Sequence, residues 1–435
     1  MLDLIIKNGS CFIDGKIKEQ DIAVKNGKIL KIGEISEESK EVYDAKNLLV
    51  LPGCIDTQTH FREPGSTDTE DLHSGSRAAI AGGITAVFEM PNTNPPTSNI
   101  KEFQRKLDLA KNRMYCNYAF YFGATADNSE DLANLKKLEG CCGIKLFAGS
   151  STGNLLVADE QNIEKVFKNS SKVVAVHSED EEILNINKKL IKNGDVHSHP
   201  IWRSVECAMS STRRIVRIAE KYNKKAHVLH ITTKEEIDFL SQHKGNITFE
   251  ITPQHLTIYA PNCYDKLGTY AQMNPPIRDK SHYDRLWYAV KNNLNDTIGS
   301  DHAPHLKKNK EKVYPNSPSG MPGVQTLMPV MLDHVNSGKL SINQLISFVC
   351  ENPVKIFGIK NKGFIKEKYD ADFTIVNMSK KITIKNENIE SKCKWSPFNN
   401  VEFKGTPIAT IIAGKIKMKE GKILGEPDGN PLLFN

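Results

Sequence analysis

Strand-like apolar runs alternate with helical patterns through the middle of the chain, and this alternation constrains the fold more than any other feature. Strands that alternate with helices pair in parallel, and eight such repeats close into a barrel. We therefore predict an α/β fold built on a (β/α)8 TIM barrel. Its strands are expected at Val50–His60, Ile84–Met90, Tyr115–Phe122, Gly143–Phe147, Val173–His177, Ala226–Ile231, Ile247–Ile251 and Thr297–Ser300.

Both ends of the chain show a different pattern, in which short alternating runs are separated by turn residues. The runs Ala371–Val376 and Ala409–Gly414 near the C-terminus resemble those before residue 53. We predict that residues 1–53 and 365–435 together form a small β-sandwich and that residues 54–364 form the barrel domain. The pairs typical of hairpin turns are Asn8-Gly9, Asp14-Gly15 and Asn26-Gly27.

Polar side chains recur where the predicted barrel strands end. On the first strand Asp56, Gln58, His60 and Arg62 alternate, so they are expected on one face. A single polar residue at a strand end is usually structural. Six strands with the same feature favour a functional site, because barrel enzymes keep their sites at the carboxyl ends of the strands. The residues on the later strands are Asn92, Lys145, His177, His230 and Asp301.

Imidazole and carboxylate groups in such a cluster suit Zn²⁺. A zinc site with an open position lowers the pKa of bound water to about 7, which favours hydrolysis of a polarised carbonyl. Lys145 is unexpected there, because an ammonium group repels a divalent cation. Carboxylation of its amine would convert it into a bridging carboxylate. The alternative is an ordinary ion pair with Asp301 or another carboxylate.

Composition and sequence pattern indicate the cellular compartment and the class of ligand. No apolar run approaches the length of a membrane span, and the first residues lack the pattern of a signal peptide. The nine cysteines are scattered, which is typical of reduced thiols in the cytoplasm. The net charge of +6 is spread along the chain, so we expect a small anionic substrate and no nucleic acid.

Several short stretches together resemble the dihydroorotase family, in the cyclic amidohydrolase branch of the urease-like metal-dependent hydrolases. The resemblance runs essentially from end to end. The matching stretches are His60–Gly65, Ser74–Ala79 with Gly82-Gly83, Met90–Thr93, Gly143–Phe147, His177–Glu179, His227–His230, Asn274–Pro276, Asp301–His305 and Lys394–Phe398.

The resemblance implies reversible cyclisation of N-carbamoyl-L-aspartate to L-dihydroorotate in pyrimidine synthesis, with one or two zinc ions. It implies that His60 binds one metal, that His177 and His230 bind the other, and that carboxylated Lys145 bridges them. Asp301 would be a metal ligand and the general acid/base. The implied substrate contacts are Arg62, Asn92 and His305 to the carboxylate, and Asn274 and Gly323 to the ring.

The chain departs from the family pattern at Gln58, where a histidine is usual. An amide oxygen is a poor zinc ligand, so we predict that the first metal is weakly held or absent. Two alternatives stay open. One is a sister cyclic amidase such as allantoinase or dihydropyrimidinase, and the other is an inactive scaffold for aspartate transcarbamoylase, for which Gln58 is the best argument.

The resemblance also implies an oligomer, possibly a dimer, and an association with aspartate transcarbamoylase is conceivable. The pair His197 and His199 has metal-ligand spacing, but residues 193–203 read as a polar loop. We expect Ser178, Glu179 and Thr232 to orient His177 and His230, because a ligating imidazole needs a partner for its second nitrogen.

Overall fold

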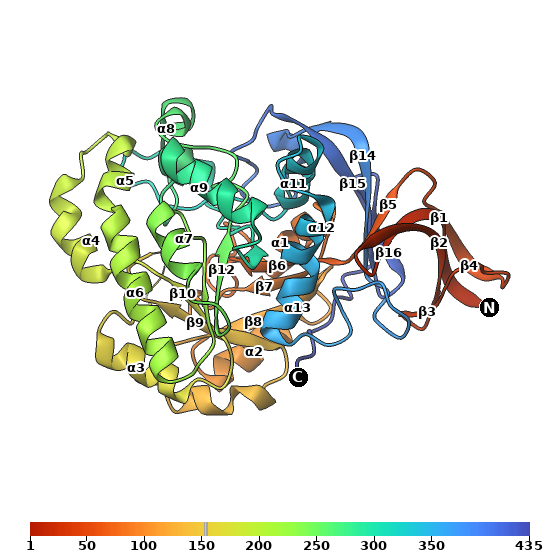
Figure 1. Cartoon of the computed structure of the whole chain (residues 1–435), viewed down its shortest axis with the longest axis horizontal. Helices are drawn as coiled ribbons and strands as arrows, with labels where there is room; N and C mark the ends of the chain where they lie inside the picture. The colour runs from red at the N-terminus through yellow and green to blue at the C-terminus, as the bar shows by residue number, and fades with distance from the viewer. Residues whose placement is uncertain (152, 154) are drawn as a thin grey trace.

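The computed structural model describes residues 1–151, 153 and 155–435. Its centre is a parallel barrel whose strands follow one another in chain order from β6 to β13 (Figure 1). Backbone pairing of Thr59 with His302 joins the first strand to the segment after the last. The predicted TIM barrel is therefore confirmed. Its strands are β6 (Cys54–Thr59), β7 (Ile84–Glu89), β8 (Asn117–Gly123), β9 (Cys141–Phe147), β10 (Val174–His177), β11 (Ala226–Val228), β12 (Ile247–Ile251) and β13 (Thr297–Ile298).

Amphipathic helices surround the barrel. In α6 the Ser204 side chain caps the N-terminus by accepting a hydrogen bond from Cys207 N, and Ile215, Val216 and Ala219 are buried. The helices are α1 (Leu72–Ala81), α2 (Ile100–Ala110), α3 (Glu160–Asn169), α4 (Glu181–Asn187), α5 (His199–Trp202), α6 (Val205–Lys221), α7 (Lys234–Leu240), α8 (Asn262–Leu267), α9 (Lys280–Lys291), α10 (Lys307–Lys310), α11 (Leu327–Asn336), α12 (Ile342–Ile346) and α13 (Asn352–Phe357).

The two ends of the chain meet in a second sheet beside the barrel, which confirms the predicted composite β-sandwich (Figure 1). Strand β5 joins the two halves, because it pairs with β1 on one side and β14 on the other. Leu4, Ile22 and Val24 from the N-terminal half share a core with Phe373 and Ile411. The strands are β1 (Leu2–Ile13), β2 (Lys16–Lys25), β3 (Lys28–Ile32), β4 (Ser39–Asp44), β5 (Leu49–Pro52), β14 (Phe373–Thr383), β15 (Glu402–Ile412), β16 (Lys415–Lys419) and β17 (Lys422–Ile423).

The prediction of one continuous strand over Val50–His60 was wrong. The strand is interrupted at Gly53. As a result, β5 belongs to the terminal sheet and β6 to the barrel. Gly53 N donates to Asp372 O at 2.9 Å, and a Cβ atom at this position would lie 2.4 Å from Thr85 Oγ1. Only glycine fits this crossing between the two sheets.

The predicted turn at Asn8-Gly9 was also wrong. These residues lie inside β1, where the pairing with β2 shifts register between Ile6 and Gly9, and Asn8 has a φ of 60°. The pair forms a bulge, because a residue with positive φ is as suitable for a bulge as for a hairpin turn. The predicted turns at Asp14-Gly15 and Asn26-Gly27 do connect β1, β2 and β3.

Two parts of the C-terminal region leave the sheet and contact the barrel. Trp395 is buried and donates from its indole nitrogen to His305 O at 2.7 Å. Leu432 N donates to Tyr118 O on β8 at 2.8 Å. The first contact supports the loop that carries His305, near the predicted site, and the second fixes the end of the chain at the start of β8.

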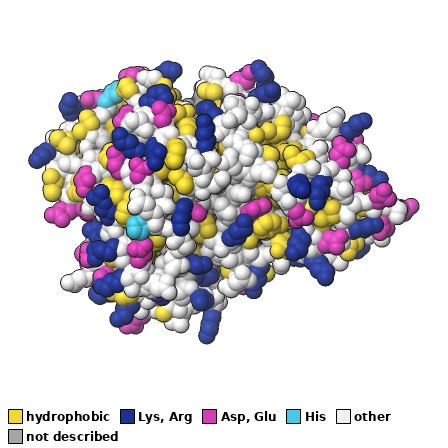
Figure 2. All heavy atoms as spheres, in the orientation of Figure 1, with side chains coloured by type: hydrophobic (Ala, Val, Ile, Leu, Met, Phe, Trp, Pro, Cys, Tyr) yellow, Lys and Arg dark blue, Asp and Glu magenta, His cyan; other side chains and the backbone are white. Residues whose placement is uncertain are grey.

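Among the described residues, no helix combines the length and apolarity needed to cross a bilayer. On the face seen in Figure 2, acidic and basic side chains are intermixed.

Candidate active site

A cavity at the carboxyl ends of the barrel strands collects nearly all the predicted site residues. Three of them have left-handed backbone conformations, with φ of 62° at Arg62, 39° at His230 and 44° at Asp301. Such conformations cost about 1–3 kcal/mol each and are concentrated at functional sites. The lining residues are Gln58, His60, Arg62, Asn92, Lys145, Phe147, Ser151, His177, His230, Asn274, Asp301, Ala303, Ser319 and Gly320.

His177 at the end of β10 and His230 after β11 face each other across the cavity. Their nearest nitrogens, His177 Nδ1 and His230 Nε2, are 3.1 Å apart. His177 Nε2 lies 2.8 Å from Glu179 Oε2, so the protonated nitrogen is the one that faces the carboxylate and Nδ1 presents its lone pair to the cavity. Both nitrogens can therefore point at a common ligand.

Glu179 was expected to orient His177, and the structure places it in contact. Burial opposes its charge, but Arg203 and His177 lower the pKa of the Glu179 carboxyl to about 2. Arg203 donates to Glu179 and to Ser150 O. Ser178 and Thr232 do not orient the histidines, since Ser178 bonds to Ser211 and Thr212, and Thr232 accepts from Arg278. Sequence alone gave no signal for Arg203, because it lies on a distant segment.

His60 and Asp301 form a second pair of facing groups. His60 Nε2 is 3.3 Å from Asp301 Oδ1, while His60 Nδ1 is 2.8 Å from Asn92 Oδ1. Gln58 donates from Nε2 to the same Asp301 oxygen at 2.9 Å, and its Oε1 is buried without a partner among the described residues. In this arrangement the amide acts as a donor that positions Asp301.

Lys145 on β9 is almost completely buried. Its ammonium group lies 4.5 Å from the centre of the Phe147 ring and has no ion-pair or hydrogen-bond partner within the described part of the chain. Burial lowers the pKa of Lys145 to about 7, against the opposing effects of Asp301 and Glu250. A substantial neutral fraction follows at neutral pH, and only a neutral amine can add to carbon dioxide.

Burial also sets the charge of the other groups. It lowers the pKa of His60, His177 and His230, so these imidazoles are neutral and able to bind a metal. Burial and, to a smaller extent, Glu250 raise the pKa of Asp301 to about 7, although Lys145 opposes this. Asp301 can therefore exchange a proton near neutral pH.

A cationic side chain, Arg62, lines the same cavity as the His177–His230 and His60–Asp301 pairs. Arg62 is buried, donates from Nε to Pro304 O at 3.3 Å, and has Nη2 at 3.5 Å from His305 Nε2. His305 Nε2 also lies 3.0 Å from Ser319 O. A buried guanidinium without a carboxylate partner among the described residues is suited to an anionic ligand group.

The two residues predicted to touch a substrate ring differ in their placement. Asn274 lines the cavity and its Oδ1 lies 3.1 Å from His199 Nε2. Gly323 is not among the described residues that line the cavity, because its N–H binds His302 Nδ1 at 3.1 Å and its α-carbon packs against Ser300. Ser319 and Gly320, a few residues earlier in the chain, do line the cavity.

The prediction that residues 193–203 form a polar loop was wrong. Residues 199–202 form helix α5, and His199 is buried against Met273 and Asn274. Burial is the main reason that the pKa of His199 falls to about 3. His-x-His spacing drew attention to this residue but pointed to the wrong role, since His199 positions Asn274.

The donor set fits a zinc ion. Tetrahedral zinc with bonds of about 2.0–2.1 Å to nitrogen places neighbouring ligand atoms about 3.3 Å apart. The His177–His230 and His60–Asp301 pairs have separations of 3.1 and 3.3 Å. Within the described residues no three His, Cys, Asp or Glu side chains form a complete metal group. Lys145 lines the same cavity and could supply a further ligand only as a carboxylate.

Comparison with known proteins gives consistent results. A model of the amidohydrolase family matches residues 49–417. The chain is 33% identical to a dihydroorotase of Methanosphaera stadtmanae, with 88% of each chain covered. It is 34% identical to a dihydroorotase of Pyrococcus furiosus, covering 89% of this chain and 86% of the relative. For a dihydroorotase of Methanosarcina mazei the values are 33%, 100% and 98%.

Among solved structures, the fold is similar to an L-hydantoinase (dihydropyrimidinase) from Arthrobacter aurescens. The TM-score is 0.94 and the identity 28%, over 99% of both chains. A dihydropyrimidinase from Brevibacillus agri gives a TM-score of 0.91 and 25% identity, over 99% of this chain and 98% of the relative.

Proposed function

The chain belongs to the amidohydrolase family, and on this premise we propose that it is a dihydroorotase, which interconverts N-carbamoyl-L-aspartate and L-dihydroorotate. The named relatives, at 33–34% identity over most of the chain, support this choice. Retention of His60, Lys145, His177, His230 and Asp301 in one cavity argues against an inactive scaffold.

The observation that carries the proposal is the buried Arg62, which lines the same cavity as the His177–His230 and His60–Asp301 pairs. L-Dihydroorotate bears a carboxylate next to its ring, whereas dihydrouracil and other neutral rings do not. Arg62, together with Asn92 and His305, would hold that carboxylate by charge-assisted hydrogen bonds. A cyclic amidase for neutral rings would gain nothing from a buried cation at this position.

Asp301 would move the proton in both directions. In ring opening, a water oxygen adds to the amide carbonyl carbon and Asp301 accepts the proton that this water loses. When the carbon–nitrogen bond breaks, Asp301 delivers the proton to the departing nitrogen. The reverse sequence closes the ring and releases water. A carboxyl pKa of about 7, raised mainly by burial, suits a group that must accept and donate at neutral pH.

Zinc bound by His177, His230 and carboxylated Lys145 would polarise the amide carbonyl and make the attacking water more acidic. We propose that this position is the principal one. The first position, at His60 and Asp301, has the Gln58 amide nitrogen directed at Asp301, and an N–H donor cannot bind a cation. The protein would then hold one zinc ion firmly and a second weakly or not at all.

We also propose a cytoplasmic enzyme. All nine cysteines are free and buried, which is consistent with a reducing compartment. An association with further copies of the chain or with aspartate transcarbamoylase stays a prediction from family resemblance.

Substrate choice tests the proposal directly. Ring opening of L-dihydroorotate and of dihydrouracil should be followed for the protein and for Arg62→Met. We expect turnover of dihydroorotate alone, and a fall in kcat/KM of roughly 10²-fold or more in the variant, since a buried charged contact is lost. Faster opening of dihydrouracil by the unmodified protein would favour the sister amidase.

A further inference from the structure

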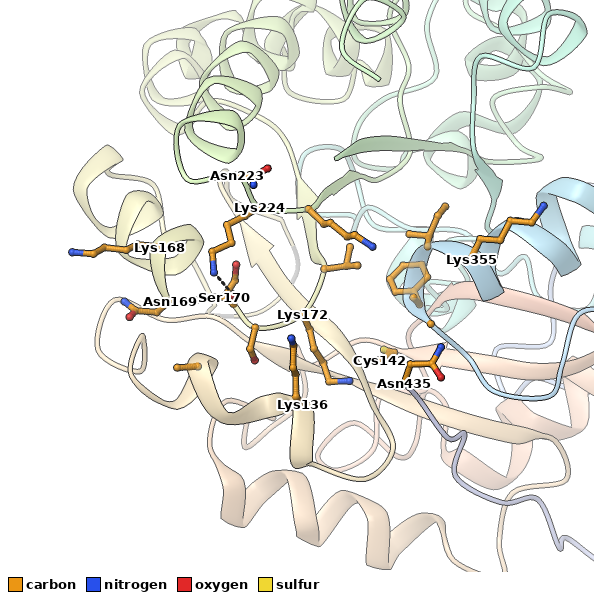
Figure 3. Close-up of a pocket in the computed structure, with 17 residues that line it drawn as sticks. Lys136, Cys142, Lys168, Asn169, Ser170, Lys172, Asn223, Lys224, Lys355 and Asn435 are labelled. Carbon is orange, nitrogen blue, oxygen red and sulfur yellow. Dashed lines mark hydrogen bonds between the residues drawn. The ribbon is translucent and has the colours of Figure 1, made fainter. Parts of the chain in front are cut away.

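A second cavity lies at the opposite end of the barrel, where the strands begin. It encloses about 750 Å³ and is bordered by the segments that lead into β9, β10 and β11 and by the end of α13. Figure 3 shows these segments around the cavity. A volume of this size is within the range of small-molecule sites. No residue of the candidate active site lines it.

The charged side chains among the described residues that line this cavity are all lysines. Its lining contains no aspartate or glutamate side chain among the described residues. Figure 3 shows Lys136, Lys172 and Lys224 around the middle of the cavity, with Lys168 and Lys355 at its two ends. Concave surfaces lined by one charge concentrate the electrostatic potential. The lysines of the lining are Lys136, Lys168, Lys172, Lys224, Lys225 and Lys355.

Most of these ammonium groups lack a counter-charge. The ammonium groups of Lys136, Lys168 and Lys225 have no hydrogen-bond or ion-pair partner within the described part of the chain. Lys172 lies over the Phe434 ring at 4.8 Å, and Lys224 donates to Ser170 O at 2.6 Å, which uses one of its three N–H groups. Lys355 is paired with Glu351 at 3.3 Å. Gathering like charges is unfavourable unless an anion joins them.

We propose that this cavity binds a small polyanion that carries several linked phosphate groups. Lysine ammonium groups bind phosphate as point charges, and a chain of phosphates can contact several of them at once. A concave site of limited volume suits a small molecule better than the flat surface that a large partner would need. The cavity is a binding site separate from the one that opens the ring.

The apolar part of the lining suggests the source of the phosphates. Val173, Ile356 and Phe357 give the cavity an apolar side, against which a nucleoside could rest. A nucleoside triphosphate and free polyphosphate share the phosphate chemistry, but only the first would use this wall. Lys172 lies two residues before β10, which ends at His177, and Lys225 directly precedes β11, which leads to His230, so a bound polyanion would contact segments next to the strands that carry the site.

Binding to the full-length protein tests the proposal without reference to catalysis. Sodium tripolyphosphate and ATP should be titrated calorimetrically at one fixed ionic strength, against the unmodified protein and the Lys136→Ala/Lys172→Ala/Lys225→Ala variant. The control is Lys16→Ala/Lys31→Ala, which removes two unpartnered lysines of the terminal sheet. Circular dichroism and dihydroorotate turnover report whether the variants are folded.

We expect both ligands to bind and the cavity variant to raise Kd at least tenfold, with no change in the control. Equal affinities would identify polyphosphate as sufficient, and tighter ATP binding would add the nucleoside contact. Failure of both ligands to bind, or an equal loss in the control, would overturn the proposal. So would a single-stranded oligonucleotide that binds tighter than both and depends on the same lysines, since it would make the partner a nucleic acid.

Discussion

At the scale of single residues, Asp301 occupies an energetically unfavourable position. It is buried, has a left-handed backbone, and accepts from Gln58 while facing His60. Backbone strain and burial of a carboxyl group both destabilise the fold, so residues in such positions are concentrated at functional sites. The same features make Asp301 suitable as the group that moves the proton.

Replacing Asp301→Asn tests this role. The amide keeps the shape but cannot accept a proton, so we expect kcat to fall roughly 10²–10⁴-fold with an unchanged far-ultraviolet circular dichroism spectrum. Asp284→Asn, which alters an exposed ion pair with Lys280, is the control. Full activity of the Asp301 variant would refute the proposed proton transfer.

The proposed zinc stoichiometry depends on Gln58. Gln58→His would place an imidazole beside His60 and Asp301, where the amide nitrogen now lies. We expect bound zinc, measured by elemental mass spectrometry after dialysis, to rise from about one to about two ions per chain. Gln104→His on the exposed face of α2 controls for unspecific binding. If Gln58→His binds no more zinc than the unmodified protein, the amide is not what limits the first position.

At the scale of elements, the pattern of alternating strands and helices was enough to predict the barrel, but not where its strands stop. Two predicted strands are longer than β11 and β13, which end before His230 and Asp301. The left-handed backbone at these two residues turns the chain out of the sheet. Apolar periodicity carries no information about such a turn, since it depends on what the side chains must reach.

In the candidate site, too, some features could be predicted from the sequence and others could not. Residues at strand ends, such as His177 and Lys145, follow from the order of the strands, because parallel strands bring their carboxyl ends together. The contacts of Glu179 with Arg203 and of Asn274 with His199 depend on loops far apart in the chain. Their pairing is set by packing of the whole fold, so no local pattern could reveal it.

Gly53 tests how β5 and β6 divide between the two sheets. A methyl group there would overlap Thr85 Oγ1 and lie 2.8 Å from Asp372 Cβ. We expect Gly53→Ala to lower the free energy of unfolding by about 1–3 kcal/mol, the range for overpacked sites. Urea unfolding followed by circular dichroism measures it. A change below about 0.5 kcal/mol, within the range of ordinary surface substitutions, would mean that the crossing is looser than the structure indicates.

At the scale of the whole molecule, buried neutral histidines make folding sensitive to acid. His334 lies outside the active site, with Nε2 at 3.0 Å from Thr257 Oγ1, and burial lowers its pKa to about 3, with Lys339 adding to the effect. The unfolded chain binds a proton at this histidine below about pH 6.5, whereas the folded chain does not. This group therefore favours unfolding increasingly as pH falls from 6.5 toward 3.

The expected effect is at most about 1.4 kcal/mol per pH unit in that window. Urea unfolding of the unmodified protein and of His334→Gln should be compared at pH 7.5 and pH 5. The variant should lose less stability than the unmodified protein over this interval, because its amide does not titrate. Equal losses would show that His334 is protonated in the folded protein.

The two ends of the barrel differ in whether their cavities could be predicted from the sequence. The carboxyl ends of the strands carry residues typical of a known family, and their cavity follows from that pattern. The lysines at the amino ends come from the connections before β9, β10 and β11 and, for Lys355, from α13, and no local pattern marks any of them. Only the closed barrel brings them to one cavity.

The most direct test of the proposed zinc-dependent dihydroorotase activity is the rate of L-dihydroorotate ring opening before and after metal chelation. This rate is followed by loss of ultraviolet absorbance. We expect turnover that disappears when the metal is removed and returns when Zn²⁺ is added back, with allantoin and dihydrouracil inert throughout. Turnover that persists in metal-free protein, or no turnover of dihydroorotate in any state, would contradict this proposal.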